Sequence, residues 1–152
     1  MLSERPVPFD LKPQGGKLSL VMAAQVIELA EQIRTILKRD PRYRPEAYEF
    51  VIQALHHTLE KAGERRHVSA RELLEGIRDY ALERFGQLAL VVLEAWNVKA
   101  TDDFGEIVFN LIDARLMGKT DTDTREDFHA VYDFHDAFGG HEPLKVEWTD
   151  EE

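Results

Sequence analysis

Apolar residues recur every three or four positions in the first part of the chain, which is the period of a helix with one buried face. Asp40-Pro41 ends the first of these patterns, because the residue before a proline avoids helical torsions. Pro45 suits the first position of a second helix, and Gly63 suits its end. The first apolar stripe consists of Met22, Val26, Leu29, Ala30, Ile33, Ile36 and Leu37, and the second of Tyr48, Val51, Ile52, Leu55 and Leu59.

A third helix is predicted to begin after Ser69, because Ser69 and Glu72 have the spacing of a capping box. Its pattern ends near Gly86. From residue 88 to residue 96 the sequence is apolar on all sides, and such a helix is expected to be central and covered by several neighbours. Asn97 tolerates the left-handed conformation that ends a helix.

A fifth helix is predicted to begin at Thr101 or Asp102, with Gly118 placed where a helix would stop. After it the sequence leaves two alternatives open. Residues 116–120 and 128–134 have the alternation of a short β-hairpin, whereas Thr124 and Asp127 have the spacing of a helix cap. The fold class is therefore mainly α, a multi-helix domain with a winged-helix-like C-terminal part over residues 69–134.

The expected organisation is a flexible N-terminal arm over residues 1–17, rich in proline and glycine, followed by a single helical domain over residues 18–138. Residues 139–152 form an acidic C-terminal tail. Residues 49–55 align with residues 106–112, so the domain is interpreted as two related units, about 40–97 and 98–138. Amphipathic helices resemble one another by default, which leaves duplication and coincidence as equal alternatives.

Composition adds limits to this picture. A chain of 152 residues fits one domain that buries roughly two-thirds of its unfolded surface. The apolar stretches are far shorter than the ~20 residues of a membrane span, so no membrane partner is expected. The absence of cysteine excludes disulfides and cysteine chemistry, and the N-terminus lacks the pattern of a signal peptide. We expect a cytoplasmic protein.

The net charge of -10 is unevenly distributed. Residues 1–120 hold 17 basic against 18 acidic side chains, whereas residues 121–152 hold two against 11, so nine of the ten excess negative charges lie in the last 32 residues. Two earlier segments are basic, residues 34–44 and 61–71. Solvated helix ends explain such segments most simply, and a surface for an anionic partner is the alternative.

Catalytic patterns are weak, so the protein is predicted not to be an enzyme and to need no cofactor. Ser69 is explained as a cap, and no Gly-x-Ser-x-Gly turn is present to expose a serine nucleophile. Asp103-Phe104-Gly105 has the letters of the kinase metal motif without the other kinase loops. His129, Asp133, His135, His141 and Glu142 lie close in sequence, but a solvated tail explains them better than a metal site does.

A nucleic-acid-binding function is the alternative hypothesis. The helix after Thr101 is acidic, and acidic groups near phosphates are repelled, so this helix is not expected to enter a groove. Binding would use the two basic segments, with the acidic C-terminal region as a competitor. The candidate anion-binding residues are Arg34, Lys38, Arg39, Arg42, Arg44, Lys61, Arg65 and Arg66.

Protein interaction ranks first among the predicted functions, as a non-catalytic binding or adaptor module with an unknown protein partner. Phe109 lies off the main apolar stripe of its helix, and Phe50 occupies the corresponding position of the echo. Either ring is a candidate for lining a partner groove. The simpler interpretation is that both pack the two units together, because large aromatic residues dominate cores as well as interfaces.

Several longer motifs carry a family resemblance. They are residues 67–69 with 72–78, residues 101–111, residues 118–120 with 125–128, and residues 40–43 with 47–51. Together they cover about residues 40 to 138 and resemble an uncharacterised repeat-protein family of planctomycetes and verrucomicrobia. The resemblance implies no activity, cofactor or binding residue, and it favours the interpretation of the echo as a genuine repeat. Asn97 stands where relatives are expected to have glycine.

Overall fold

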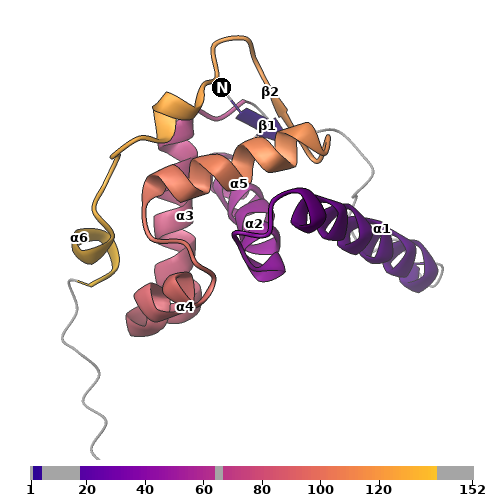
Figure 1. Cartoon of the computed structure of the whole chain (residues 1–152), viewed down its shortest axis with the longest axis horizontal. Helices are drawn as coiled ribbons and strands as arrows, with labels where there is room; N and C mark the ends of the chain where they lie inside the picture. The colour runs from indigo at the N-terminus through magenta and orange to yellow at the C-terminus, as the bar shows by residue number, and fades with distance from the viewer. Residues whose placement is uncertain (1, 5–17, 64–66, 140–152) are drawn as a thin grey trace, which may run out of the picture.

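The structure is a computed structural model that describes residues 2–4, 18–63 and 67–139, with side chains described from residue 23 onwards. It is mainly helical, as the sequence predicts (Figure 1). The elements in chain order are β1 (Leu2–Glu4), α1 (Leu18–Arg39), α2 (Pro45–Ala62), α3 (Ala70–Phe85), the 3-10 turn η2 (Gly86–Leu88), α4 (Ala89–Ala95), α5 (Thr101–Asp113), β2 (Met117–Lys119), the 3-10 turn η3 (Arg125–Phe128) and α6 (Phe134–Phe138).

Most predicted helix ends are confirmed. Ser69 and Glu72 form the capping box, with the Glu72 N–H 3.1 Å from Ser69 Oγ and the Ser69 N–H 3.2 Å from Glu72 Oε1. Gly63 ends α2 with φ 72°, and Asn97 is left-handed with φ 66°. Asn97 also donates its side-chain amide to the Arg42 carbonyl at 2.8 Å, which ties the end of α4 to the start of α2.

The ends of α5 differ from the prediction. Its N-cap is Ala100, and the Asp103 carboxylate reaches back to accept the Lys99 and Ala100 N–H groups at 2.9 and 3.2 Å. Thr101 is instead buried in the first turn, where it donates to the Phe128 carbonyl at 2.7 Å. The helix stops at Asp113 because Arg115 adopts φ 62°, so Gly118 lies beyond the helix in β2.

Of the two alternatives for the segment after α5, the short β-hairpin between residues 116–120 and 128–134 is not formed. The cap is present instead, because the Thr124 N–H lies 3.0 Å from Asp127 Oδ2 at the start of η3. Met117–Lys119 pairs antiparallel with Leu2–Glu4 from the opposite end of the chain. After η3 the chain passes through a turn, with Ala130 at φ 47°, and then forms α6. Strand pairing joins residues far apart in sequence, so the local alternation did not reveal the partner. The same finding corrects the N-terminal arm, because residues 2–4 form a strand; residues 5–17 lie outside the described residues.

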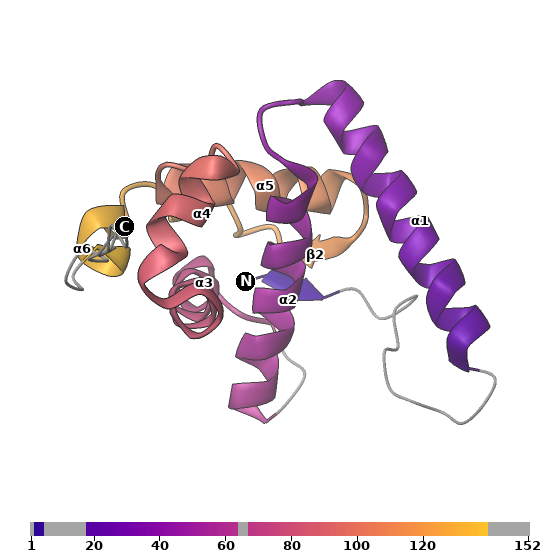
Figure 2. The ribbon, with the colours of Figure 1, turned by 90° about the horizontal axis from the view of Figure 1, so that it is seen from below.

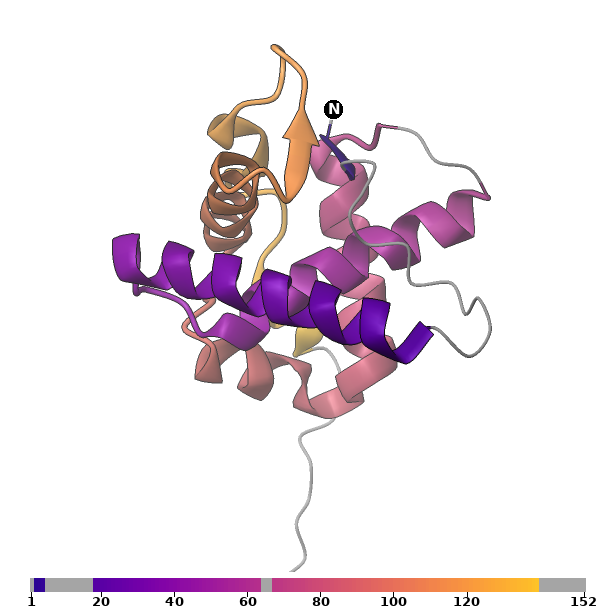
Figure 3. The same cartoon turned by 90° about the vertical axis from the view of Figure 1, so that its right-hand side faces the viewer.

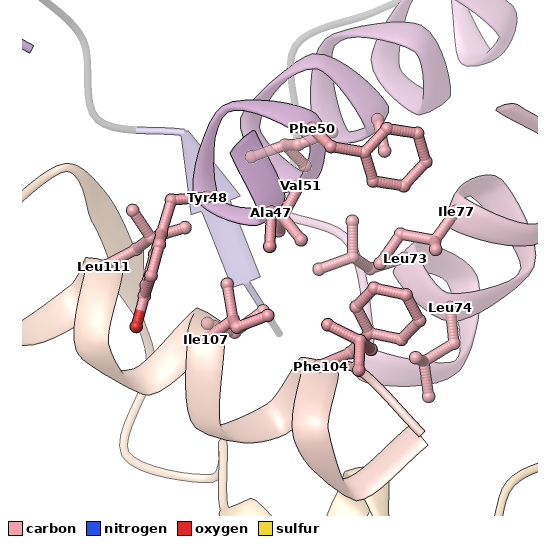
Figure 4. Packing of buried hydrophobic residues seen from close by; sticks show 14 of the residues in the cluster. Ala47, Tyr48, Phe50, Val51, Leu73, Leu74, Ile77, Phe104, Ile107 and Leu111 are labelled. Carbon is pink, nitrogen blue, oxygen red and sulfur yellow. The ribbon is translucent and has the colours of Figure 1, made fainter. Parts of the chain in front are cut away.

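The core is built on α2, against which α1, α3 and α5 all pack. Figure 4 shows side chains of α2, α3 and α5 pointing toward one another, with Tyr48 between α2 and α5. Tyr48, Leu73 and Phe104 are each fully buried. The residues that α2 buries are Ala47, Tyr48, Phe50, Val51, Ala54, Leu55 and Leu59.

The other helices lie around this centre. The C-terminal end of α1 lies beside α2, and the N-terminal end of α1 diverges from α2 (Figure 2). Figure 3 shows α1 crossing in front of α2. α4 lies at the periphery, in contact with α3 and α6. Among the described residues, no helix has both the length and the hydrophobicity to cross a membrane.

Gly105 lies where α5 packs closely against Phe128 of η3. A Cβ at this position would lie 2.8 Å from Phe128 Cβ and 3.0 Å from Phe128 Cγ, and Phe128 is only 1% exposed. Alanine in an unhindered helix interior is more stable than glycine by roughly 1 kcal/mol. The clash with Phe128 makes alanine less stable than glycine at this position. We predict that Gly105→Ala lowers the free energy of unfolding by about 1–3 kcal/mol in urea denaturation; an increase would contradict this packing.

Candidate functional site

The two basic segments lie at opposite ends of α2 and do not form one surface. Arg44 precedes the first residue of α2 and Lys61 lies in its last turn. These positions are separated by the length of an 18-residue helix, about 27 Å at 1.5 Å per residue. Arg65 and Arg66 lie outside the described residues. The predicted anion-binding residues are therefore divided between two places.

Within the first segment, Arg42 is committed to internal ion pairs. Its guanidinium binds the Asp40 carboxylate through two hydrogen bonds of 2.8 and 2.7 Å, and it reaches Glu106 on α5 at 3.2 Å. These contacts raise the pKa of Arg42 and hold the pKa of Asp40 well below its usual range. Arg125 approaches the other oxygen of Glu106 at 3.5 Å. Arg42 thus joins the α1–α2 connection to α5 and is not a free cation.

The remaining basic side chains are more exposed. Arg34, Lys38 and Arg39 lie on the C-terminal part of α1, and no acidic partner is found for them among the described residues. Arg44 lies 3.7 Å from Glu46, and Lys61 lies 3.9 Å from Asp79, both as exposed pairs. Pairs of this kind contribute little to stability. Among the described residues of this region, the basic side chains without an acidic partner are therefore those of α1.

Part of the polar side of α5 is an internal contact. Asn110 is 6% exposed and donates to Asp40 at 2.9 Å and to the Tyr48 hydroxyl at 3.0 Å. Asp103 accepts the Tyr43 hydroxyl at 2.6 Å, and burial together with this carboxylate raises the pKa of Tyr43. This side of α5 holds the α1–α2 connection in place. It is not an open recognition surface.

The two aromatic candidates for a partner groove are both buried. Phe50 is 3% exposed and packs against Tyr80 and Trp96, with ring centroids 5.3 and 5.4 Å apart. Phe109 is 7% exposed, lies edge-on to the Phe128 ring, and is covered by the Arg125 guanidinium 4.8 Å from its ring centre. Each ring packs against residues of its own half of the chain. Neither offers a surface to a partner in this structure.

An exposed apolar surface lies instead on α4. We define the α4 face as Leu88, the last residue of η2, together with Val91, Val92 and Ala95 of α4, whose spacing puts them on one side of the helix. Leu88 is 50% exposed and Val91 is 61% exposed. Only Ala89 and Leu93 of α4 are buried. The prediction that this helix is central and covered on several sides is therefore wrong for the described chain.

The base of α4 is held by a cluster of aromatic rings. Trp96 packs against Phe50 and Phe85, with centroid distances of 5.4 and 5.7 Å. Arg84 covers Phe85 and donates to the Tyr80 hydroxyl at 2.9 Å. Phe85 and Trp96 are themselves only half-buried. The α4 face is thus a fixed apolar surface beside partly exposed aromatic rings.

A second exposed apolar region lies on the N-terminal part of α1. Val26 is 57% exposed although Ile33, on the same side of the helix two turns later, is 2% exposed. The difference arises because α1 diverges from α2 there (Figure 2). The other exposed apolar residue, Ile27, is 59% exposed but points about 100° away from Val26. These two residues do not share one face, in contrast to Leu88 and Val91.

The histidine-rich segment is used for local structure. His129 Nδ1 lies 2.7 Å from Asp102 Oδ2, and the Asp133 carboxylate accepts the His135 and Asp136 N–H groups at the start of α6. His141 and Glu142 lie outside the described residues. Within the described ranges, no group of three histidine or acidic side chains is placed to hold a metal ion.

A scan against protein families finds no match to the chain. Searches of the curated proteins and of the solved structures also find no match. The resemblance to a repeat-protein family therefore stays a prediction, and the function rests on the chemistry of the surfaces described above.

Asn110 provides a test of the contact between α5 and the α1–α2 connection. Asn110→Ala removes the donor to both Asp40 and Tyr48 and leaves two polar groups with one partner fewer. We predict a loss of about 1–3 kcal/mol in the free energy of unfolding. Asp113→Ala, at an exposed position of the same helix, is the control and should change it by less than about 0.5 kcal/mol. Equal effects would contradict a specific role for Asn110.

The His129–Asp102 pair predicts a dependence on pH. Its hydrogen bond to Asp102 raises the pKa of His129, so the charged histidine stabilises the fold below the usual histidine pKa. That stabilisation is lost as pH rises through the higher folded pKa. The melting temperature of the natural chain relative to His129→Gln should therefore fall between about pH 5.5 and about pH 8.5. An unchanged difference would show that the pair contributes nothing.

Proposed function

We propose that this chain is a non-catalytic protein-interaction module that binds its partner through the α4 face. The observation that carries the proposal is the exposure of Leu88 and Val91 on one side of a helix that has a single charged residue, Glu94. A helix that is apolar all round is normally covered on several sides. The described chain covers α4 on one side only.

The surroundings of the α4 face suit a binding surface. Contiguous exposed apolar residues with a polar rim are typical of protein interaction sites. Exposed Gln87 and Glu94 flank the face, and the half-buried rings of Phe85 and Trp96 lie beside it. Aromatic residues are enriched in interface cores. The aromatic cluster also limits the motion of α4, which lowers the entropic cost of binding.

The predicted cytoplasmic location, the winged-helix likeness and the two-unit repeat belong to this proposal as well. The winged-helix likeness is supported by the order α3, α4, α5 and β2. The repeat is supported by the alignment of residues 49–55 with residues 106–112. Acidic winged-helix and helical-repeat units often serve as docking surfaces for proteins. This support for the proposal is an analogy of fold.

The first test is a pull-down with the full chain from extracts of its source organism. Leu88→Gln with Val91→Gln should reduce capture of the specific partner by at least about tenfold, because two apolar anchors are lost. Capture by the natural chain should resist salt washes. Both side chains are at least half exposed, so the melting temperature should hardly change.

The matched control is Val26→Gln with Ile27→Gln, at two residues of similar exposure on α1. It should keep full capture. If the α4 double variant captures the same protein as strongly as the natural chain does, the α4 face is not the binding surface. Salt-sensitive and nuclease-sensitive capture would indicate nucleic acid instead.

Nucleic-acid binding is the second candidate, because Arg34, Lys38 and Arg39 on α1 have no acidic partner among the described residues. Three phosphate contacts would give a slope of about -2 to -3 for log K against log salt concentration. Neutralising all three with glutamine should abolish low-salt binding to duplex DNA or RNA. Arg71→Gln, on the exposed surface of α3, is the control. Absence of low-salt binding, or equal loss in the control, would exclude α1 as the site.

A further inference from the structure

α1 continues past the surface that α2 covers. Among its described side chains, α1 buries Ile33 and Ile36, which are 2% and 1% exposed, where the helix packs on α2. Leu29, one turn earlier, is only partly buried, and Val26 is 57% exposed. α1 diverges from α2 in this direction (Figure 2). One apolar side of α1 is therefore covered in its C-terminal part and uncovered in its N-terminal part.

The uncovered part continues the same apolar seam. Residues 26, 29, 33 and 36 are separated by three, four and three positions, which is the spacing of a seam between two paired helices. α2 covers the second half of this seam, at Ile33 and Ile36. The first half has the same spacing, but Val26 remains in solvent. The seam is therefore suited to a second helix beyond the reach of α2.

The positions that flank this first half are small or uncharged. They are Ala23, Gln25, Ala30 and Gln32. Charges at flanking positions select a different partner helix, and they keep identical helices apart because like charges then face one another. α1 has no charge at these four positions, so a second copy of the same helix is a compatible partner. Ala23 and Ala30 are exposed, and their small side chains allow two helices to approach closely.

The rest of the fold determines the direction of such a pair. α2 and the helices around it lie beside the C-terminal part of α1 (Figure 3). Parallel copies of α1 would bring both folds to the same end of the pair, whereas antiparallel copies place them at opposite ends. α6, with Asp133 and Asp136, lies on the side of the described chain away from α1 (Figures 1 and 2). An antiparallel pair therefore also keeps these acidic ends apart.

We propose that two copies of this chain pair through residues 23–32 of α1, antiparallel and related by a two-fold axis. The pairing covers Val26 and Ala30 of each copy. Ten helical residues span about 15 Å. This contact is smaller than that of a permanent dimer, so association depends on concentration over roughly 10–1000 µM. The α4 face takes no part in it, so this inference is independent of the proposed function.

Sedimentation velocity of the full chain tests the pairing. The average mass should rise from one copy toward two as the concentration increases. Val26→Glu should raise the dissociation constant at least about tenfold, because it places a charge in the apolar seam of both copies. Ile27→Glu is the matched control, since Ile27 is 59% exposed but points about 100° away from Val26, and it should leave association unchanged. Melting temperatures should hardly change in either variant, because both side chains are exposed.

A charge swap tests whether both copies contribute the same surface. Val26→Lys alone should weaken association as Val26→Glu does. An equimolar mixture of the two variants should associate more strongly than either alone, because opposite charges then lie within about one turn of each other across the two-fold axis.

Four results would overturn the pairing. They are a monomer at every concentration up to about 1 mM, equal effects of Val26→Glu and Ile27→Glu, no gain in the mixture, and association that is lost in Leu88→Gln with Val91→Gln but kept in Val26→Glu. The last result would place the contact between copies on the α4 face.

A distance measurement tests the antiparallel direction. The chain has no cysteine, so Lys38→Cys, at an exposed position near the C-terminal end of α1, carries a single nitroxide label. In an antiparallel pair centred near residue 28 the two labels are about 30 Å apart along the helix axis, whereas parallel helices would hold them about 10 Å apart. Double electron–electron resonance at high concentration should give a maximum at roughly 30–40 Å. A maximum below about 20 Å would overturn the antiparallel pair.

Discussion

The packing of three helices onto α2 decides which surfaces of the other elements stay exposed. α2 buries seven side chains, and α1, α3 and α5 each cover part of its surface. The places around the core are then occupied, and α4, despite its apolar sequence, is left at the edge between α3 and α6. The exposure of Leu88 and Val91 follows from this arrangement. The described chain leaves one side of the seven-residue α4 uncovered.

The distribution of charge follows from the same packing. α5 must present its polar side to the α1–α2 connection, and the carboxylates there are matched by Arg42, Tyr43 and Asn110. A side chain that neutralises a buried or half-buried partner is not available for phosphates. The acidic character of α5 therefore reflects an internal contact at Asp103 and Glu106.

Local features of the fold were predictable from the sequence. The capping box at Ser69, the stop at Gly63 and the left-handed Asn97 are short-range effects, and each is present in the structure. The apolar stripes also identified the helices that pack on α2. These predictions hold because caps and periodic faces depend on residues a few positions apart.

Long-range features were not predictable in the same way. The strand partner of Met117–Lys119 is Leu2–Glu4, more than one hundred residues away, and no local pattern encodes that choice. The apolar run at residues 88–96 predicted a central, covered helix, but Leu88 and Val91 are at least half exposed. Phe109 was a candidate for a partner groove because it lies off the main apolar stripe of its helix, and Phe50 because it occupies the corresponding position of the echo. Tertiary neighbours cover both. The candidate site became visible only when exposure was known residue by residue.

We propose that α4 completes its burial by contact with a partner protein. The most direct measurement is site-specific photocrosslinking in cells, with a photoreactive amino acid at position 91 of the full chain and a control at position 27, where exposure is similar. We expect a crosslinked adduct with one partner protein from position 91 and none of that adduct from position 27. The absence of any protein adduct at position 91, or the same adduct from both positions, would contradict it.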